Sequence, residues 1–278
     1  MLEKIDLSTP DQIHGEAQGV EKMKRIIYTP KGRALEYSPL ALNHYLGCDH
    51  ECTYCYNRFK WPIDDARIRK IDIELLRSEI IEQKYTDQIL LSFIGDPYCH
   101  AEMSSYWTRD ILKLLFKRGM KVAVLTKGGT RCLRDLWLFD RHKHQVKVGA
   151  TLSFISDDVA AVHEPNSAPP SERIAALRAL HESGIRTWVS VEPVLDTMEA
   201  LIAIKAVAPH VNEFRIGKLN HDKELEAKID WQDFLERVVT ILEPHRYHRI
   251  VYIKTDLREA APDVDLPPGW DDMRIGWL

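Results

Sequence analysis

The sequence predicts an α/β fold, a partial (β/α)6 TIM-like barrel with N- and C-terminal extensions. Short apolar, β-branched segments alternate with amphipathic segments, which is typical of a parallel sheet with helices outside it. About six strand–helix units can be counted, whereas a closed eight-unit barrel usually needs about 250 residues plus its extensions. For a chain of 278 residues we therefore expect an open barrel.

The predicted elements follow one another with short connections. Strands are expected at residues 42–46, 89–93, 121–126, 146–152, 186–191, 211–216 and 249–253. Helices are expected at residues 106–118, 131–140, 171–183, 197–207 and 231–242. Ser171 is the expected N-cap of the helix over 171–183, and Gly184 follows its end.

The chain divides into three predicted parts. Residues 1–37 are polar and form an N-terminal lead-in, and residues 38–255 form the barrel. Residues 256–278 form a C-terminal tail with two tryptophans, which packs on the barrel, caps it or faces a partner.

Composition limits the possible functions. The formal net charge of −4 gives no overall field that attracts nucleic acid, although 38 Lys and Arg leave room for a local basic groove. No run of about eighteen apolar residues occurs, so we expect no transmembrane helix and no membrane partner. The N-terminus lacks the pattern of a signal peptide, and the five cysteines do not suggest a disulfide framework, so a cytoplasmic location is expected.

Three of the five cysteines lie close together. Cys48, Cys52 and Cys55 have the spacing Cys-x3-Cys-x2-Cys, with an aromatic residue, Tyr54, before the third. A structural zinc site takes four ligands, and a ferredoxin-type cluster takes four thiolates. Three thiolates on one loop can instead hold a [4Fe–4S] cluster and leave one iron open to a small molecule.

Other interpretations of the three cysteines remain open. They can hold zinc, with His44, His50 or the distant Cys99 as the fourth ligand, which would suit a non-catalytic zinc-binding interaction protein. They can also be redox thiols or unrelated core cysteines.

The cysteine loop resembles the cluster loop of the radical S-adenosylmethionine (SAM) superfamily. Further segments resemble its spore photoproduct lyase-like branch, and the resemblance spans about residues 40–220. The matching segments are 47–56, 95–98 with Glu102, 126–127 with 134–135, and 164–165 with 171–173. The resemblance implies a partial barrel and a [4Fe–4S] cluster on Cys48, Cys52 and Cys55. It also implies reductive cleavage of SAM to a 5′-deoxyadenosyl radical, which abstracts hydrogen from a substrate.

Residues after successive strands are candidates for SAM contacts, because sites on parallel sheets lie beyond the C-terminal ends of the strands. Members of the superfamily receive the SAM ammonium on a glycine-containing turn, which Gly95 and Asp96 match. Gly95 permits close backbone approach, and Asp96 adds acceptor oxygens. Lys127 can pair with the SAM carboxylate as a point charge, and Tyr54 lies beside the cluster ligands.

Later strand ends add further candidates. Ser153 can hydrogen-bond the ribose of SAM, Glu192 is expected to point into the barrel, and Val194 can pack on the adenine. Arg173 lies in the first turn of a helix, where a cation is unfavourable, so it either clamps a carboxylate or pairs with Glu164. Charged groups within residues 215–221 are candidates for substrate contacts.

Tyr98, Cys99 and Tyr56 are candidates for a catalytic hydrogen donor, because S–H and phenol O–H bonds are the weakest X–H bonds among side chains. Cys99 can instead be a buried small hydrophobe. The expected partners are a flavodoxin or ferredoxin-type reductant and a substrate. Branch resemblance favours a nucleic-acid lesion or base as substrate, whereas the acidic charge and the short length favour a small molecule or peptide.

Overall fold

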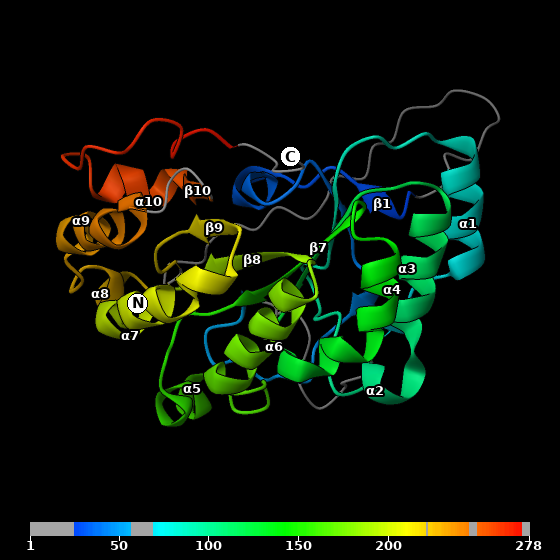
Figure 1. The fold of residues 1–278 in the computed structure, drawn as a ribbon, viewed down its shortest axis with the longest axis horizontal. Helices are drawn as coiled ribbons and strands as arrows, with labels where there is room; N and C mark the ends of the chain where they lie inside the picture. The colour runs from blue at the N-terminus through cyan, green and yellow to red at the C-terminus, as the bar shows by residue number, and fades with distance from the viewer. Residues whose placement is uncertain (1–24, 57–68, 221, 245–248, 274–278) are drawn as a thin grey trace, which may run out of the picture.

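The computed structural model describes residues 25–56, 69–220, 222–244 and 249–273, and an eight-stranded sheet lies at its centre (Figure 1). The strand order is β1-β2-β5-β6-β7-β8-β9-β10, in which β1 is antiparallel to β2 and every later neighbour is parallel. The strands are β1 (Ile27–Tyr28), β2 (Leu40–Leu42), β5 (Ile89–Leu91), β6 (Val122–Thr126), β7 (Val146–Thr151), β8 (Arg186–Val191), β9 (Glu213–Ile216) and β10 (Ile250–Ile253).

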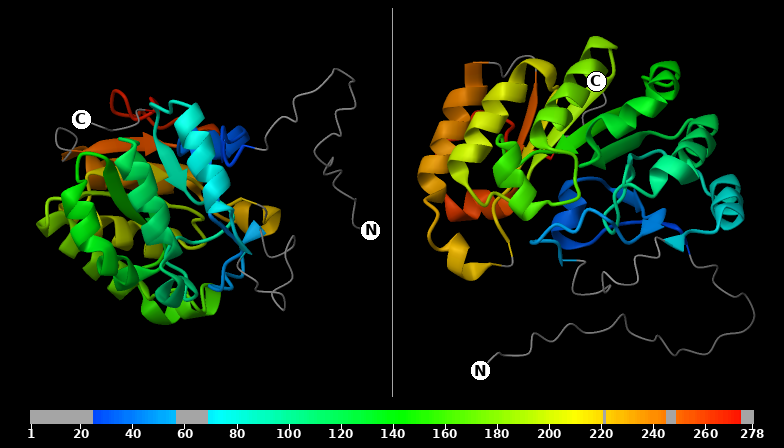
Figure 2. Two further views of the ribbon diagram at one scale, coloured as in Figure 1. Left: turned by 90° about the vertical axis from the view of Figure 1, so that its right-hand side faces the viewer. Right: turned by 90° about the horizontal axis from the view of Figure 1, so that it is seen from below.

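Helices cover the outside of this sheet (Figure 2). They are α1 (Ile73–Glu82), α2 (Glu102–Ser105), α3 (Trp107–Lys117), α4 (Leu136–Arg141), α5 (Asp157–His163), α6 (Pro170–Glu182), α7 (Thr197–Val207), α8 (Lys223–Glu226), α9 (Trp231–Leu242) and α10 (Thr255–Ala260). The 3-10 turns are η1 (Gly32–Glu36), η4 (Gly129–Asp135) and η5 (Ala208–His210). In the described part of the chain β1 and β10 remain the end strands, so the predicted open α/β barrel is confirmed.

The strands face two ways because side chains alternate along a strand. In β7, Val146 and Val148 belong to the apolar cluster that includes residues of α3 and α6, whereas Lys147 and Thr151 face the inside of the barrel. Gly149 also faces inward, where an added Cβ would lie 2.3 Å from the carbonyl oxygen of Trp188. The absence of a side chain at Gly149 therefore lets Trp188 lie across the barrel floor.

The first barrel strand differs from the predicted segment 42–46. The sheet contains β2, and the chain then leaves it to form β3 (Tyr45–Leu46), which pairs with β4 (Arg69–Lys70) in a separate two-stranded sheet. The side chain of Asn43 accepts hydrogen bonds from the backbone of Phe93 (2.8 Å) and Ile94 (3.2 Å). These bonds hold the chain at the point where it turns out of the sheet.

The predicted N-cap Ser171 is wrong. Helix α6 begins at Pro170, which fits the first turn because proline needs no partner for a missing N–H. The hydroxyl of Ser171 donates instead to Asp157 (2.6 Å). Gly184 follows the helix end with φ +73°, a conformation that favours glycine, as expected.

Both extensions contact the β10 end of the sheet. In Figure 1 η1, in dark blue, lies between β1 and β10. Glu36 accepts hydrogen bonds from the hydroxyl of Tyr252 (2.8 Å) and from the backbone of Thr255 (2.9 Å), and Ser38 donates to the carbonyl of Gln88 (2.7 Å). The segment from η1 to Ser38 therefore links the β10 end of the sheet to the start of β5.

At the other terminus the carbonyl of the buried Trp270 accepts a hydrogen bond from Ile253 (2.8 Å). Residues 1–24 and 274–278 of the predicted extensions lie outside the described residues. Among the helices that the structure describes, none combines the length and the apolarity needed to cross a bilayer.

Candidate functional site

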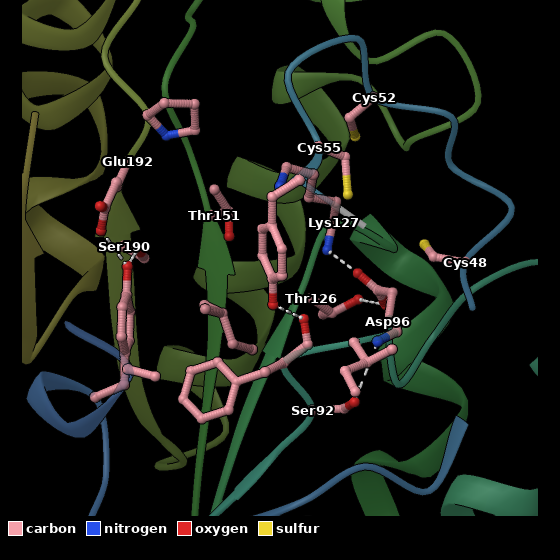
Figure 3. A pocket seen from close by; sticks show the side chains of 18 of the residues that line it. Cys48, Cys52, Cys55, Ser92, Asp96, Thr126, Lys127, Thr151, Ser190 and Glu192 are labelled. Carbon is pink, nitrogen blue, oxygen red and sulfur yellow. Dashed lines mark hydrogen bonds between the residues drawn. The ribbon is translucent and has the colours of Figure 1, made fainter. Parts of the chain in front are cut away.

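A cavity of about 380 Å³ lies at the C-terminal ends of the parallel strands. Its size falls in the range of small-molecule sites. Apolar side chains form part of its wall: Leu90, Phe93, Ile94 and Leu125. Cysteine side chains lie on one side, and Ser190 and Glu192 lie on the opposite side (Figure 3).

The cysteine loop brings Cys48, Cys52 and Cys55 into this cavity. All three are free of disulfides, and the described lining contains no fourth cysteine. Three thiols on one cavity wall fit a [4Fe–4S] cluster that keeps one iron without a protein ligand. Burial raises the pKa of the Cys48 and Cys52 thiols, so binding a metal centre there would release protons.

The loop is tied to its surroundings by its backbone and by Asp49. The Thr53 amide donates to the carbonyl of His163 (2.8 Å). The Asp49 carboxylate accepts from the amides of His100 (3.1 Å) and Ala101 (3.0 Å). Segments that follow β5 and end α5 thus fix the loop from two sides.

Asp96 lies beside the loop and orders its own turn and the end of the next strand, β6. Its carboxylate accepts hydrogen bonds from the hydroxyl of Thr126 (2.5 Å) and from the amides of Lys127 (2.7 Å) and Tyr98 (2.7 Å). The Nδ1 atom of His50 lies 3.5 Å away. Burial alone would raise the pKa of Asp96, but His50 and these hydrogen bonds outweigh it, and the pKa lies below its usual value.

Gly95 packs closely against the cysteine loop. A Cβ added to Gly95 would lie 2.6 Å from the carbonyl oxygen of Gly47 and 3.1 Å from the Cβ of Tyr45. A larger residue here would displace the start of the loop.

A second carboxylate, Glu164, gathers polar groups behind the cavity wall. It is buried, forms an ion pair with Arg173, and accepts a hydrogen bond from the hydroxyl of Tyr54. Burial would raise the pKa of Glu164, but the charges of Arg173 and Lys127 outweigh it, and the pKa lies below its usual value. Arg173 also donates to the carbonyl of Ala168 (2.7 Å), so of its two predicted roles the structure contains the pairing with Glu164.

Lys127 projects its ammonium group into the cavity near the cysteines (Figure 3). Its Nζ lies 3.9 Å from Glu164 and 5.4 Å from the ring centre of Tyr54. Burial would lower the pKa of Lys127, but Cys52 and Glu164 outweigh it and the pKa lies above its usual value. Lys127 is therefore a cation directed at the cavity beside the cysteines.

The opposite end of the cavity centres on Glu192. Its carboxylate accepts hydrogen bonds from the Tyr37 hydroxyl (2.6 Å), the Lys254 ammonium (2.5 Å) and the Asn220 amide (3.1 Å). Gly217 makes room for it, because an added Cβ would lie 2.9 Å from the carboxyl carbon. These contacts hold Glu192 in place between β8, β9 and β10.

The structure separates the predicted site residues into two groups. Those that line the cavity are Cys48, Cys52, Tyr54, Cys55, Tyr56, Gly95, Asp96, Lys127 and Glu192. Those outside the lining are Tyr98, Cys99, Ser153, Glu164, Arg173 and Val194, all of them buried.

The residues outside the lining have local explanations. The Tyr98 hydroxyl donates to Asp135 (3.0 Å), and Val194 belongs to the apolar cluster that contains residues of α7 and α9. The Ser153 hydroxyl is buried without a hydrogen-bond partner among the described residues. Tyr56, by contrast, is half exposed and donates to the carbonyl of Phe93 (2.9 Å).

The sequence prediction missed several cavity residues. Two of them could have been inferred from the sequence. Lys254 directly follows β10, as Lys127 follows β6, and Ser190 lies two residues before Glu192, so that both point to the same side of the sheet. Arg33 and Tyr37 come from the lead-in and had none. In the segment 215–221 charged groups were predicted to contact substrate, but the cavity is lined there by the uncharged Asn220, and Arg215 and Lys218 lie outside the lining.

Relatives with this sequence or fold are found by comparison. The uncharacterized protein MJ0683 of Methanocaldococcus jannaschii is 30% identical over 200 residues, which cover 70% of this chain and 74% of that protein. Streptococcus suis SuiB bound to S-adenosylmethionine superposes with a TM-score of 0.58 and 12% identity, covering 82% of this chain and 53% of SuiB. Spore photoproduct lyase complexed with dinucleoside spore photoproduct superposes with a TM-score of 0.56 and 12% identity, covering 89% of this chain and 66% of the lyase.

The chain spans about half of SuiB and less than two thirds of some other relatives, such as 55% of protein ORF301 of Acidianus two-tailed virus. The family model described as the radical SAM superfamily matches residues 42–202, which contain the cysteine loop and the strands up to β8. With this match and the open barrel that carries three cysteines at its C-terminal rim, the chain belongs to the radical SAM superfamily.

Proposed function

We propose that this radical SAM enzyme cleaves SAM reductively and abstracts hydrogen from a substrate held in the same cavity. The observation that carries the proposal is that Cys48, Cys52 and Cys55, and no fourth cysteine of the described chain, line one end of the cavity. A [4Fe–4S] cluster on these thiolates would supply the electron that converts SAM to methionine and a 5′-deoxyadenosyl radical. A flavodoxin or ferredoxin-type protein is the proposed reductant.

The chain's own residues would bind and orient SAM. Lys127 would pair with its carboxylate, and the backbone at Gly95 would receive its ammonium group. Asp96 accepts three hydrogen bonds from within the protein, so we assign it to holding Thr126 and Lys127 in place rather than to direct contact. Glu192, on the far side of the cavity, would limit how far the nucleoside part extends.

The apolar wall supports this assignment. Leu90, Phe93 and Leu125 line the cavity and can exclude water from the reacting atoms. The protein would thus contribute binding and orientation, while the cofactors contribute the redox chemistry.

The substrate is either a nucleic-acid lesion or base, or a small molecule or peptide. The structural neighbours do not decide between these classes, because one is described with the precursor peptide SuiA and another with a dinucleoside lesion. A DNA gel-shift series across salt separates them, since binding to nucleic acid should weaken steeply as salt rises. Absence of binding at low salt would disfavour the nucleic-acid class.

The decisive experiment is anaerobic reconstitution with iron and sulfide, reduction with dithionite, addition of SAM and chromatography for 5′-deoxyadenosine. We expect the product from the wild type and its loss in Cys52→Ala. Cys132→Ala is the matched control, because Cys132 is a buried free cysteine outside the cavity lining. Its variant should retain the product.

Metal analysis of the same samples tests the rival zinc site. Stoichiometric zinc without iron after anaerobic purification would contradict the proposal and support a non-catalytic zinc-binding protein. The ligand atoms of Cys48, Asp49 and His50 lie within 4.8 Å of one another, so zinc would have ligands here.

A further inference from the structure

The cavity has one part inside the family match and one part outside it. Cavity residues outside residues 42–202 come from the lead-in and from the segments after β9 and β10: Arg33, Ala34, Tyr37, Asn220 and Lys254. Tyr37, Asn220 and Lys254 all contact Glu192, which lies opposite the cysteines (Figure 3). This end of the cavity is therefore built largely by segments outside the family match.

Arg33 is the cation at this end with hydrogen-bonding capacity left. Its NH1 atom contacts Asn220 and lies 3.4 Å from Asp256. No partner within the described residues is found for its Nε and NH2 atoms, and its side chain is 55% exposed. Asn220 and Asp256 thus hold one edge of the guanidinium and leave the other edge open.

Lys254 does not offer the same capacity. Its Nζ lies 2.5 Å from Glu192 and 3.8 Å from Glu36, and its side chain is 2% exposed. The ammonium group is enclosed between two carboxylates that neutralise it. A charged substrate group that enters this end of the cavity would meet Arg33 first.

We propose that Arg33 binds a terminal oxyanion of the substrate, a carboxylate or a phosphate, at the end of the cavity opposite the cysteines. The planar guanidinium presents parallel N–H donors that match the two oxygens of such a group. The remainder of the substrate then extends over Leu90, Phe93 and Leu125 toward the cysteines. This inference rests on the proposed function and deepens it by naming the substrate class.

Equilibrium dialysis of the cluster-loaded protein at low ionic strength tests the proposal, with labelled inorganic phosphate in one arm and labelled acetate in the other. Arg33→Gln should weaken binding about tenfold, because it removes a charge-assisted hydrogen-bonding edge. The affinity of Arg33→Lys should lie between those of the wild type and Arg33→Gln, because lysine keeps the charge but lacks the two parallel N–H donors of the guanidinium. Lys31→Gln is the control, since Lys31 is an exposed cation two residues away that does not line the cavity.

The two arms identify the source of the oxyanion. If Arg33→Gln weakens the binding of phosphate alone, the substrate group is a phosphate. If it weakens the binding of acetate alone, the group is a carboxylate. Equal binding by the wild type and Arg33→Gln, or no binding by the wild type, would overturn the proposal. An equal loss in Lys31→Gln would also overturn it, because general surface charge would then explain the binding.

Failure of the oxyanion proposal can be distinguished from failure of the proposed enzymatic function. If 5′-deoxyadenosine forms but oxyanion binding does not depend on Arg33, only the substrate assignment fails. If Arg33-dependent binding is found but no SAM is cleaved, the oxyanion site stands and the enzymatic proposal fails. Thermal melting of each variant confirms that the fold is intact.

Discussion

Lys147 and Glu213 form an ion pair inside the barrel, 2.7 Å apart, although they belong to β7 and β9 and the strand β8 lies between them. Both side chains are completely buried. The Nε atom of Arg215 lies 2.8 Å from the other oxygen of Glu213, and the Lys147 ammonium lies 5.2 Å from the ring centre of Trp188. One carboxylate therefore balances two cations beneath the cavity.

This arrangement predicts unequal effects for the two members of the pair. Glu213→Gln leaves Lys147 and Arg215 as uncompensated buried cations, and we expect a loss of about 3–5 kcal/mol in the free energy of unfolding. Lys147→Met leaves Glu213 with Arg215, and we expect a loss of about 1–3 kcal/mol. Urea denaturation of both variants measures the difference, and a larger loss in Lys147→Met would contradict this account.

The same pair predicts a dependence of stability on pH. Burial lowers the pKa of Lys147 to about 8, against the raising effect of Glu213. Above about pH 8 the unfolded chain, in which lysine keeps its usual pKa, binds more protons than the folded protein. The contribution of Lys147 to the free energy of unfolding therefore increases as pH rises. This contribution is fully present above the unfolded pKa and is lost as pH falls through about 8.

The pH dependence is measured as a difference. We expect the wild type to gain about 2 kcal/mol relative to Lys147→Met between about pH 7 and pH 9.5. Other titrating groups cancel because both proteins contain them. An unchanged gap across this range would mean that Lys147 keeps an ordinary pKa in the folded protein.

Local patterns predicted the part of this architecture that depends on neighbouring residues. The segment 121–126 is an apolar strand, and the residue that follows it, Lys127, necessarily lies on the C-terminal rim with the ends of the other parallel strands. The contact between Tyr37 and Glu192 joins residues 155 positions apart. No periodicity or spacing within the sequence encodes such a contact.

Alternation alone also could not separate the rim from the core. Thr151 lines the cavity, whereas Ser153, two residues later, is buried outside it because the chain has already left β7. Val194 follows a strand end but turns into the apolar cluster under α7. The prediction of side-chain direction holds within a strand and ends where the strand ends.

The contact between Gly95 and the cysteine loop gives a third prediction. In Gly95→Ala the new methyl group would press on the carbonyl of Gly47, and overpacking of this kind typically reduces stability by about 1–3 kcal/mol. The displacement acts directly on the loop that carries Cys48. We therefore expect a lower iron content per folded molecule after reconstitution.

Gly184→Ala is the matched control for Gly95→Ala. Gly184 has φ +73° and no atom within 4 Å of an added Cβ, so its variant should lose about 1 kcal/mol without affecting the loop. Iron and sulfide analysis, combined with urea denaturation, separates the two effects. Equal iron content in both variants would show that the loop tolerates the shift.

The last prediction concerns the cation beside the cysteines. Lys127→Gln removes the positive charge that we assign to the SAM carboxylate, while Glu164 keeps its ion pair with Arg173, so the fold should survive. We expect SAM to bind about tenfold more weakly, because one charge-assisted contact is lost. Equilibrium dialysis of labelled SAM against cluster-loaded protein measures this, with iron content determined on the same samples.

Lys113→Gln is the control, because Lys113 forms a surface pair with Asp110 that contributes little. Unchanged SAM affinity in Lys127→Gln at full iron content would assign the SAM carboxylate to another group of the cavity.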